Sequence, residues 1–84
     1  MIENIDFDVL NRVVNCIYGR FDDFGANFTV IDGRLNTITV RNDFENGNGL
    51  QRFSIDLSLR IESHDGTDRQ EIIDCFRSFG INAI

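Results

Sequence analysis

The apolar residues of this 84-residue chain change their spacing twice, and that change constrains the fold more than any other feature. In residues 6–24 they recur at intervals of three and four, which is typical of an amphipathic helix. In residues 26–63 they alternate with polar residues, as in β-strands that bury one face. From residue 67 onward the helical spacing returns. The chain is therefore expected to form an α+β domain, with strands between two helices.

Capping signals bound both predicted helices. Asp6 is the expected N-cap of the first helix. Gly19 weakens its last turn and allows an early end, and Gly25 marks the latest possible end. In the second helix, the segment Thr67-Asp68-Arg69-Gln70 fits a capping box with Thr67 as the N-cap. Gly80 directly follows the last apolar residue of the helical stripe, which predicts a Schellman-type stop.

Three strands are predicted between the helices, at residues 27–31, 37–42 and 53–61. A glycine-rich and asparagine-rich turn at residues 46–49 precedes the third strand, whose alternation is the clearest in the chain. Both helices can bury their apolar stripes on the apolar face of such a sheet. Residues 1–84 are thus predicted to form a single two-layer α-β-β-β-α domain, with a three-stranded antiparallel sheet and both helices packed on one face. The predicted core includes Leu10, Val14, Ile17, Ile55, Leu57, Leu59, Ile72 and Phe76.

The dipeptide Asp32-Gly33 is a strong signal for a hairpin between the first two strands. A plain two-residue loop with an unbroken ladder would place Phe28 on the face opposite Ile38, which divides the apolar residues between two faces. An odd-length loop or a compensating bulge would pair these two residues and gather the apolar side chains. We therefore predict the odd loop or the bulge.

Cys16 and Cys75 belong to no C-x-x-C pair, and each lies beside apolar residues in a predicted helix. This pattern favours two buried, reduced thiols, and a disulfide between the helices is the alternative. The N-terminus has neither the basic nor the apolar region of a secretion signal, and no apolar run approaches about 20 residues. A cytoplasmic location is expected.

Acidic residues outnumber basic residues by 14 to 8, which gives a formal net charge of −6. This charge opposes binding to nucleic acid phosphates and to anionic membranes, and it favours a positively charged partner. A surface of spaced carboxylates can imitate the phosphates of DNA, whereas the alternative is that the same residues stabilise helix N-termini and keep the chain in solution. The candidate partner-binding residues are Asp22, Asp23, Asp65, Asp68, Glu71 and Asp74.

The polar face of the predicted sheet is a second candidate binding surface, or a homodimer interface. A flat face that carries hydroxyl and guanidinium groups can make many specific hydrogen bonds, although antiparallel sheets commonly leave one face to water. The residues expected on it are Thr37, Thr39, Arg41, Ser54, Asp56, Ser58 and Arg60.

No catalytic, cofactor or metal motif is recognisable. His64 adjoins Asp65, a pairing that can provide a general base, but no Ser or Cys is placed by a motif as a nucleophile, so a solvated turn histidine is expected. Gly47-Asn48-Gly49 is followed by a predicted strand instead of a helix, which indicates a hairpin loop and not a nucleotide site. The acidic residues near this loop lack the EF-hand spacing. We expect no enzyme, no cofactor and no bound metal.

Small size, acidity and the lack of a catalytic motif favour a small acidic binding protein that inhibits or neutralises a macromolecular partner by stoichiometric binding. Phage anti-defence proteins, antitoxins and immunity proteins act in this way. The expected partner is a protein with a basic surface, without direct binding to nucleic acid or membrane, and a homodimer is compatible with this expectation. The competing class is a homo-oligomeric structural or assembly accessory protein.

Overall fold

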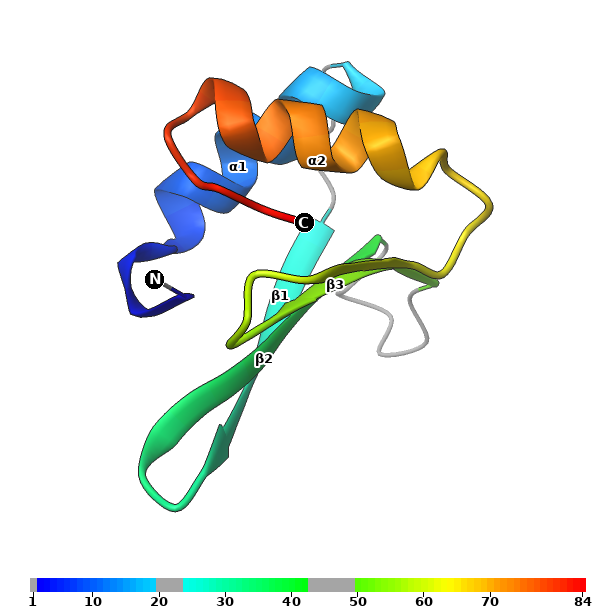
Figure 1. Cartoon of the computed structure of the whole chain (residues 1–84). Helices are drawn as coiled ribbons and strands as arrows, with labels where there is room; N and C mark the ends of the chain where they lie inside the picture. The colour runs from blue at the N-terminus through cyan, green and yellow to red at the C-terminus, as the bar shows by residue number, and fades with distance from the viewer. Residues whose placement is uncertain (1, 20–23, 43–49) are drawn as a thin grey trace.

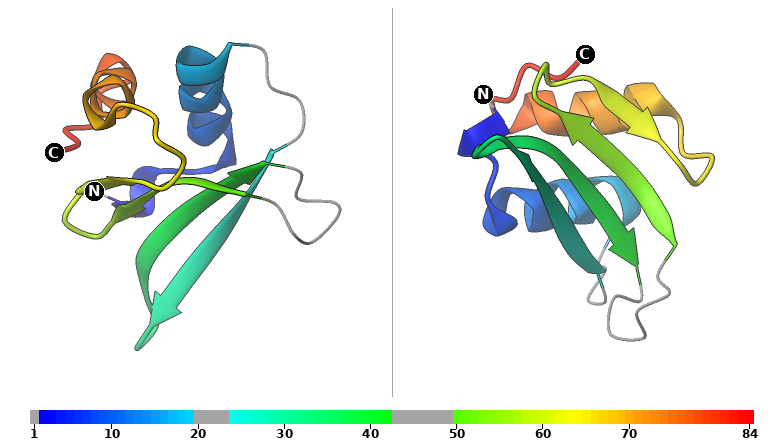
Figure 2. Two further views of the ribbon diagram at one scale, coloured as in Figure 1. Left: turned by 90° about the vertical axis from the view of Figure 1, so that its right-hand side faces the viewer. Right: turned by 90° about the horizontal axis from the view of Figure 1, so that it is seen from below.

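The computed structural model describes residues 2–19, 24–42 and 50–84. Four strands form one antiparallel sheet in the order β1-β2-β3-β4. Helices α1 and α2 lie on the same side of this sheet (Figure 1), and the two layers are seen edge-on in Figure 2. The elements are the 3-10 helix η1 (Ile2–Asn4), α1 (Phe7–Tyr18), β1 (Phe24–Ile31), β2 (Arg34–Asn42), β3 (Gln51–Asp56), β4 (Ile61–Ser63) and α2 (Arg69–Ser78).

The predicted third strand is two strands in the structure, so the expectation of a three-stranded sheet was wrong. The chain reverses direction between β3 and β4. The Asp56 carboxylate accepts hydrogen bonds from the backbone N–H groups of Ser58 and Arg60, at 2.9 and 3.1 Å. Leu59 adopts a left-handed backbone conformation with φ of 62°. These local bonds replace the extended backbone that a continuous strand requires.

The alternation of apolar residues conceals this turn. Ile55 pairs with Ile61 across the β3–β4 hairpin, so both side chains face the same side, as they would in one continuous strand. Leu57 lies in the turn and is 60% exposed, so its place in the predicted core was wrong. Ile17 and Leu59, also predicted in the core, are partly buried and pack against it.

The core fills the space between the sheet and the two helices. The rings of Phe53 and Phe76 meet edge to face, with centroids 5.8 Å apart. Burying an apolar side chain of this size stabilises the fold by about 1.5 to 3 kcal/mol, so these residues are the main source of stability. The completely buried side chains include Leu10, Val13, Val14, Ile38, Val40, Phe53, Ile55, Ile61, Ile72 and Phe76.

The helix caps follow the sequence signals with one exception. Asp6 caps α1 as predicted, because its carboxylate accepts a backbone N–H of the first turn. The N-cap of α2 is Asp68 and not Thr67, whose hydroxyl lies near the side chain of Tyr18. Gly80 adopts φ of 84°, and the backbone bonds that follow it close the predicted Schellman motif.

The β1–β2 hairpin contains the predicted bulge. Asp32 and Gly33 both adopt positive φ in a two-residue loop, and the pairing register then shifts between Thr29 and Val30. The shift places Phe28 opposite Ile38, so the apolar side chains share one face, as predicted. The end of this hairpin extends beyond the helices (Figures 1 and 2).

Cys16 of α1 and Cys75 of α2 form a disulfide, so the prediction of two reduced thiols was wrong. The two helices lie against each other and bring the Cα atoms to 6.0 Å, within the range that a disulfide spans. The cysteines are 59 positions apart in the chain, and their proximity arises only from the packing of the two helices.

Candidate functional site

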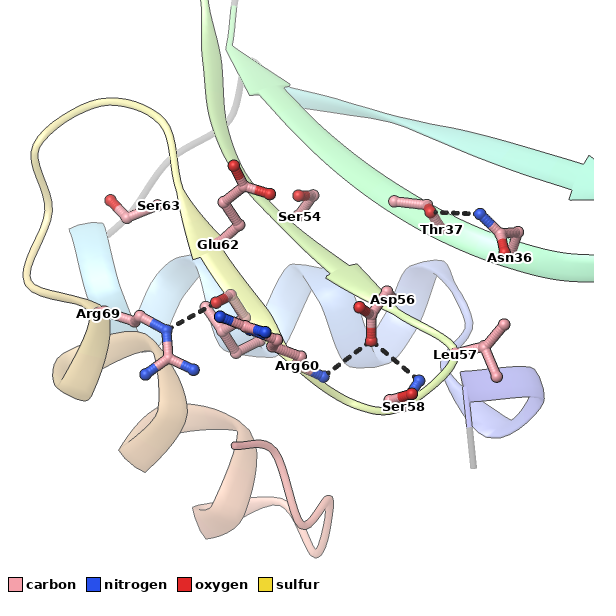
Figure 3. A pocket seen from close by; sticks show the side chains of 11 residues that line it. Asn36, Thr37, Ser54, Asp56, Leu57, Ser58, Arg60, Glu62, Ser63 and Arg69 are labelled. Atoms are coloured by element: carbon pink, nitrogen blue, oxygen red, sulfur yellow. Dashed lines mark hydrogen bonds between the residues drawn. The ribbon is translucent and has the colours of Figure 1, made fainter.

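The polar outer face of the sheet is hollowed beside the β3–β4 turn (Figure 3). The hollow has a volume of about 790 Å³. Hydroxyl, carboxylate, amide and guanidinium groups line it, and they come from β2, β3, β4, the β3–β4 turn and the first residue of α2. We call this feature the polar hollow; its polar lining residues are Asn36, Thr37, Ser54, Asp56, Ser58, Arg60, Glu62, Ser63 and Arg69.

Five of the residues predicted on the polar face line the polar hollow, whereas Thr39 and Arg41 do not. Arg69 was not predicted there. It reaches the hollow from α2, and its Nε donates a hydrogen bond of 2.7 Å to the backbone carbonyl of Ile61. Since groups of both charge signs meet in the hollow, it suits a polar peptide or protein loop better than a single ion.

Ser54 and His64 form a side-chain pair that sequence reasoning did not find. The Ser54 Oγ lies 2.9 Å from the His64 Nε2, and either atom is able to donate, depending on the histidine tautomer. Asp65 does not orient His64, because the hydrogen bonds of the Asp65 carboxylate go to Arg52, Tyr18 and Thr67. Within the described residues no carboxylate orients the imidazole of His64.

The carboxylate of Asp65 is buried among partners from three parts of the chain. It accepts hydrogen bonds from Arg52 at 3.0 Å, from the Tyr18 hydroxyl at 3.2 Å and from the Thr67 backbone N–H at 3.0 Å. The Arg52 guanidinium also lies over the Tyr18 ring, 5.0 Å from its centroid. The side chain of Asp65 is only 2% exposed, so it serves internal structure.

This environment shifts two pKa values in opposite directions. Burial opposes ionisation of Asp65, but its hydrogen bonds from Thr67, Arg52 and Tyr18 outweigh burial and hold the pKa of this carboxyl below its usual value. Burial, reinforced by the negative charge of Asp65, raises the pKa of Tyr18 above its usual value. Asp65 is therefore ionised and Tyr18 is neutral at pH 7.

A bulge in β3 turns Arg52 toward this buried cluster. Val40 pairs with Phe53 and Arg41 pairs with Gln51, which leaves Arg52 as the extra residue of the bulge. A bulge interrupts the strict alternation of faces and re-aims a side chain. Arg52 thus packs against Tyr18, the last residue of α1, on the helical side of the sheet.

Of the six predicted partner-binding residues, the structure describes four and brings three of them together on one surface. Asp22 and Asp23 lie outside the described residues. The carboxylate of Asp65 is enclosed by its internal hydrogen bonds. The remaining three lie at the start and along the exposed side of α2, three residues apart. We call them the acidic ridge: Asp68, Glu71 and Asp74.

The acidic ridge has no cationic partner within the described ranges. Asp74 accepts a hydrogen bond of 2.9 Å from the Gln70 side chain, and Asp68 accepts the Gln70 backbone N–H at 3.1 Å. The two arginines of α2 donate their Nε hydrogens to backbone carbonyls, as Arg69 does to Ile61 and Arg77 does to Ala83. The negative charges of the ridge are therefore left to solvent.

Comparison with known proteins finds no family model, no curated protein and no solved structure that matches the chain. In the part of the chain that the structure describes, no helix is long and apolar enough to cross a membrane. The same part holds no group of three or more His, Cys, Asp or Glu side chains able to bind a metal ion.

Proposed function

We propose that this chain is a small acidic binding protein, which inhibits or neutralises a macromolecular partner by stoichiometric binding. The acidic ridge of α2 is the proposed contact surface, and its partner is a protein with a basic patch. The observation that supports this proposal is the exposure of three carboxylates on one helix with no cation paired to them among the described residues. Phage anti-defence proteins, antitoxins and immunity proteins are functional classes that fit it.

Stabilisation of α2 explains the presence of only two of the three carboxylates in the acidic ridge. Negative charge in the first helical turn is favoured by the helix dipole, which explains Asp68 and Glu71. Asp74 lies beyond that turn, where the dipole no longer favours a carboxylate. Within the described residues its side chain gains one hydrogen bond, from Gln70, a pair worth about 0.2 to 0.5 kcal/mol. Contact with a positively charged group of the partner protein supplies a reason for a negative charge at this position.

The net charge of −6 extends the attraction beyond direct contact. Complementary charges raise association rates because they guide the two surfaces toward each other before contact. The helix backbone that carries the ridge is already ordered before binding, which lowers the cost of the interface.

The test uses the full chain to capture a partner by cross-linking, followed by isothermal titration of the purified pair. We expect saturation at a fixed ratio and about tenfold weaker binding when Glu71→Gln and Asp74→Asn are combined, which corresponds to about 1.4 kcal/mol. Asp68 is left intact because it caps α2. The matched control, Glu3→Gln with Asp8→Asn, removes the same charge from exposed sites near α1. Substoichiometric action on the partner would contradict the proposal.

DNA mimicry is a more specific form of the same proposal. Residues three apart on a helix lie about 5 to 6 Å from each other, so the ridge presents its charges in a short regular row. A partner that normally binds DNA should then be displaced from the ridge by duplex DNA at low salt. A partner that binds duplex DNA and this protein at the same time would exclude mimicry and leave the basic protein surface as the ligand.

A cytoplasmic location is also part of this proposal. Persistent disulfides such as Cys16–Cys75 are rare in reducing compartments, so the redox state of this pair in cells bears directly on the proposed location. Thiol trapping of the chain in intact cells, combined with fractionation, tests both points together. A fully oxidised pair found only outside the cytoplasm would contradict the proposed location.

A further inference from the structure

The two edge strands of the sheet differ in length and in their backbone hydrogen bonds. β4 has three residues, and beside it the C-terminal residue Ile84 accepts the N–H of Ile61 and donates to the carbonyl of Leu59, both at 2.8 Å. β1 has eight residues and forms the opposite edge. Apart from its ladder with β2, β1 makes no backbone hydrogen bond within the described residues. Among the residues that the structure describes, one edge is therefore covered and the other is open.

The open edge lacks the features that keep edge strands from pairing. Exposed edges are usually protected by charged side chains, by proline or by short length. The β1 sequence Phe-Gly-Ala-Asn-Phe-Thr-Val-Ile contains no charged residue and no proline, although about a quarter of the whole chain is charged. This strand is thus an uncharged strip on a strongly acidic protein.

Exposed apolar side chains accompany the open backbone. Phe28 is 46% exposed and Val30 is 60% exposed. Both belong to the last five residues of β1, all of which are exposed. The hairpin that β1 forms with β2 extends beyond the helices (Figures 1 and 2). Backbone pairing along β1 would bring further apolar surface against these side chains.

We propose that β1 pairs antiparallel with β1 of a second copy of this chain, giving a two-fold symmetric dimer with one continuous eight-stranded sheet. Antiparallel pairing of a strand with itself is self-complementary, as a two-fold interface requires. Only registers that keep the apolar side chains on one face preserve burial. Among these registers, the one centred on Phe28 gives the longest two-fold symmetric ladder about an apolar residue. It pairs Phe28 with Phe28 of the second copy, and Val30 with Ala26 of the second copy.

Pairing of β1 with its own copy buries no charged side chain, whereas a charged foreign strand would place charges against this uncharged strip. Two molecules of net charge −6 repel each other, and the uncharged strip is where they approach with the least repulsion. α2, which carries the acidic ridge, packs beside β4 at the far edge of the sheet from β1. The dimer therefore keeps the two ridges apart, and this inference does not depend on the proposed partner of the ridge.

The expected dimer is weak. A seam of one strand pair with its flanking side chains lies at the small end of protein interfaces, so dissociation constants in the range of about 1 to 100 μM are expected. Sedimentation of the full chain over micromolar to millimolar concentrations should show a reversible shift from monomer to dimer. A chain that stays monomeric throughout this range overturns the inference.

Two variants of equal charge locate the interface. Val30→Lys places a charge on the open strand, and Leu57→Lys places the same charge on a side chain that is also 60% exposed, in the β3–β4 turn. Val30→Lys should weaken the dimer at least tenfold, whereas Leu57→Lys should leave its dissociation constant unchanged within about twofold. Equal effects of the two variants, or none from Val30→Lys, would place any dimer elsewhere.

Hydrogen exchange of the unmodified chain provides a second test, which does not depend on whether a variant folds. Hydrogen exchange of the β1 amides that face away from β2 should slow at least tenfold between dilute and concentrated samples, while amides of β4 should not change. Exchange in β1 that is independent of concentration would overturn the proposed seam.

Discussion

The carboxylate of Asp65 connects three segments that are distant in the chain. It accepts hydrogen bonds from Tyr18 at the end of α1, from Arg52 in the β3 bulge and from the turn that precedes α2. Its charge is compensated by the guanidinium of Arg52, whose side chain is about a quarter exposed. Asp65, which the sequence suggests as a partner-binding residue, therefore has a structural role in the folded chain.

Asp65→Asn should lower the free energy of unfolding by about 2 to 4 kcal/mol. Removing one member of a buried ion pair is costly, and the partial exposure of Arg52 reduces this cost. Asp8→Asn is the control, because Asp8 pairs with Arg12 on the exposed surface of α1 and should cost less than about 0.5 kcal/mol. Denaturant unfolding measures both. Similar losses in the two variants would contradict the assigned role of Asp65.

The pH dependence of stability checks the same residue independently. The folded-state pKa of Asp65 is lowered from 3.8, so between the two pKa values the unfolded chain binds more protons than the folded chain. The stabilisation is fully present above about pH 5 and is lost as the pH falls through the folded-state pKa. Asp65→Asn should thus have a shallower loss of stability below about pH 4 than the unmodified chain. If the unfolding free energies of the two proteins fall in parallel as the pH is lowered, the lowered pKa of Asp65 is contradicted.

At the scale of elements, both helices were predictable because their apolar spacing and capping residues act locally. The bulge in the β1–β2 hairpin was also predictable, since burial on one face allows only registers that pair Phe28 with Ile38. The β3–β4 turn was not. Ile55 and Ile61 face the same side whether the chain continues or reverses, so alternation carries no signal for the turn, and the decisive bonds come from the Asp56 side chain.

Truncation of two side chains tests this correction. Ile61 is completely buried in β4, so Ile61→Ala should cost about 2 to 5 kcal/mol. Leu57 lies exposed in the turn, and Leu57→Ala should change stability by less than about 0.5 kcal/mol. Thermal and denaturant unfolding provide the comparison. A larger loss of stability from Leu57→Ala than from Ile61→Ala would contradict the turn and favour one continuous third strand.

The disulfide links α1 to α2 and closes a loop that contains the whole sheet. Closing a loop of this length restricts the unfolded chain, so reduction should lower stability by about 2 to 4 kcal/mol. The double variant Cys16→Ser with Cys75→Ser should match the reduced protein and should not respond to reductant. If the reductant leaves the stability of the unmodified chain unchanged, the bond does not contribute to the fold.

At the scale of the whole molecule, charge is distributed unevenly over the described surface. α2 carries the acidic ridge beside one edge of the sheet, and the opposite edge strand carries no charge. The sequence identified the ridge residues because helical spacing predicts which side chains share a side. It did not identify the diversion of Asp65 or the pairing of Ser54 with His64. Both depend on contacts between segments that meet only in the folded chain.

The rate of association with the captured partner, measured by stopped flow from about 0.05 to 0.5 M salt, tests the central claim most directly. We expect the rate constant to fall as salt rises, because screening weakens attraction between the acidic ridge and a basic surface. Glu71→Gln with Asp74→Asn should slow association about three- to tenfold at low salt and flatten the salt dependence, well beyond the effect of Glu3→Gln with Asp8→Asn. Rates that respond neither to salt nor to the ridge variant would contradict the claim and indicate that the polar hollow binds the partner.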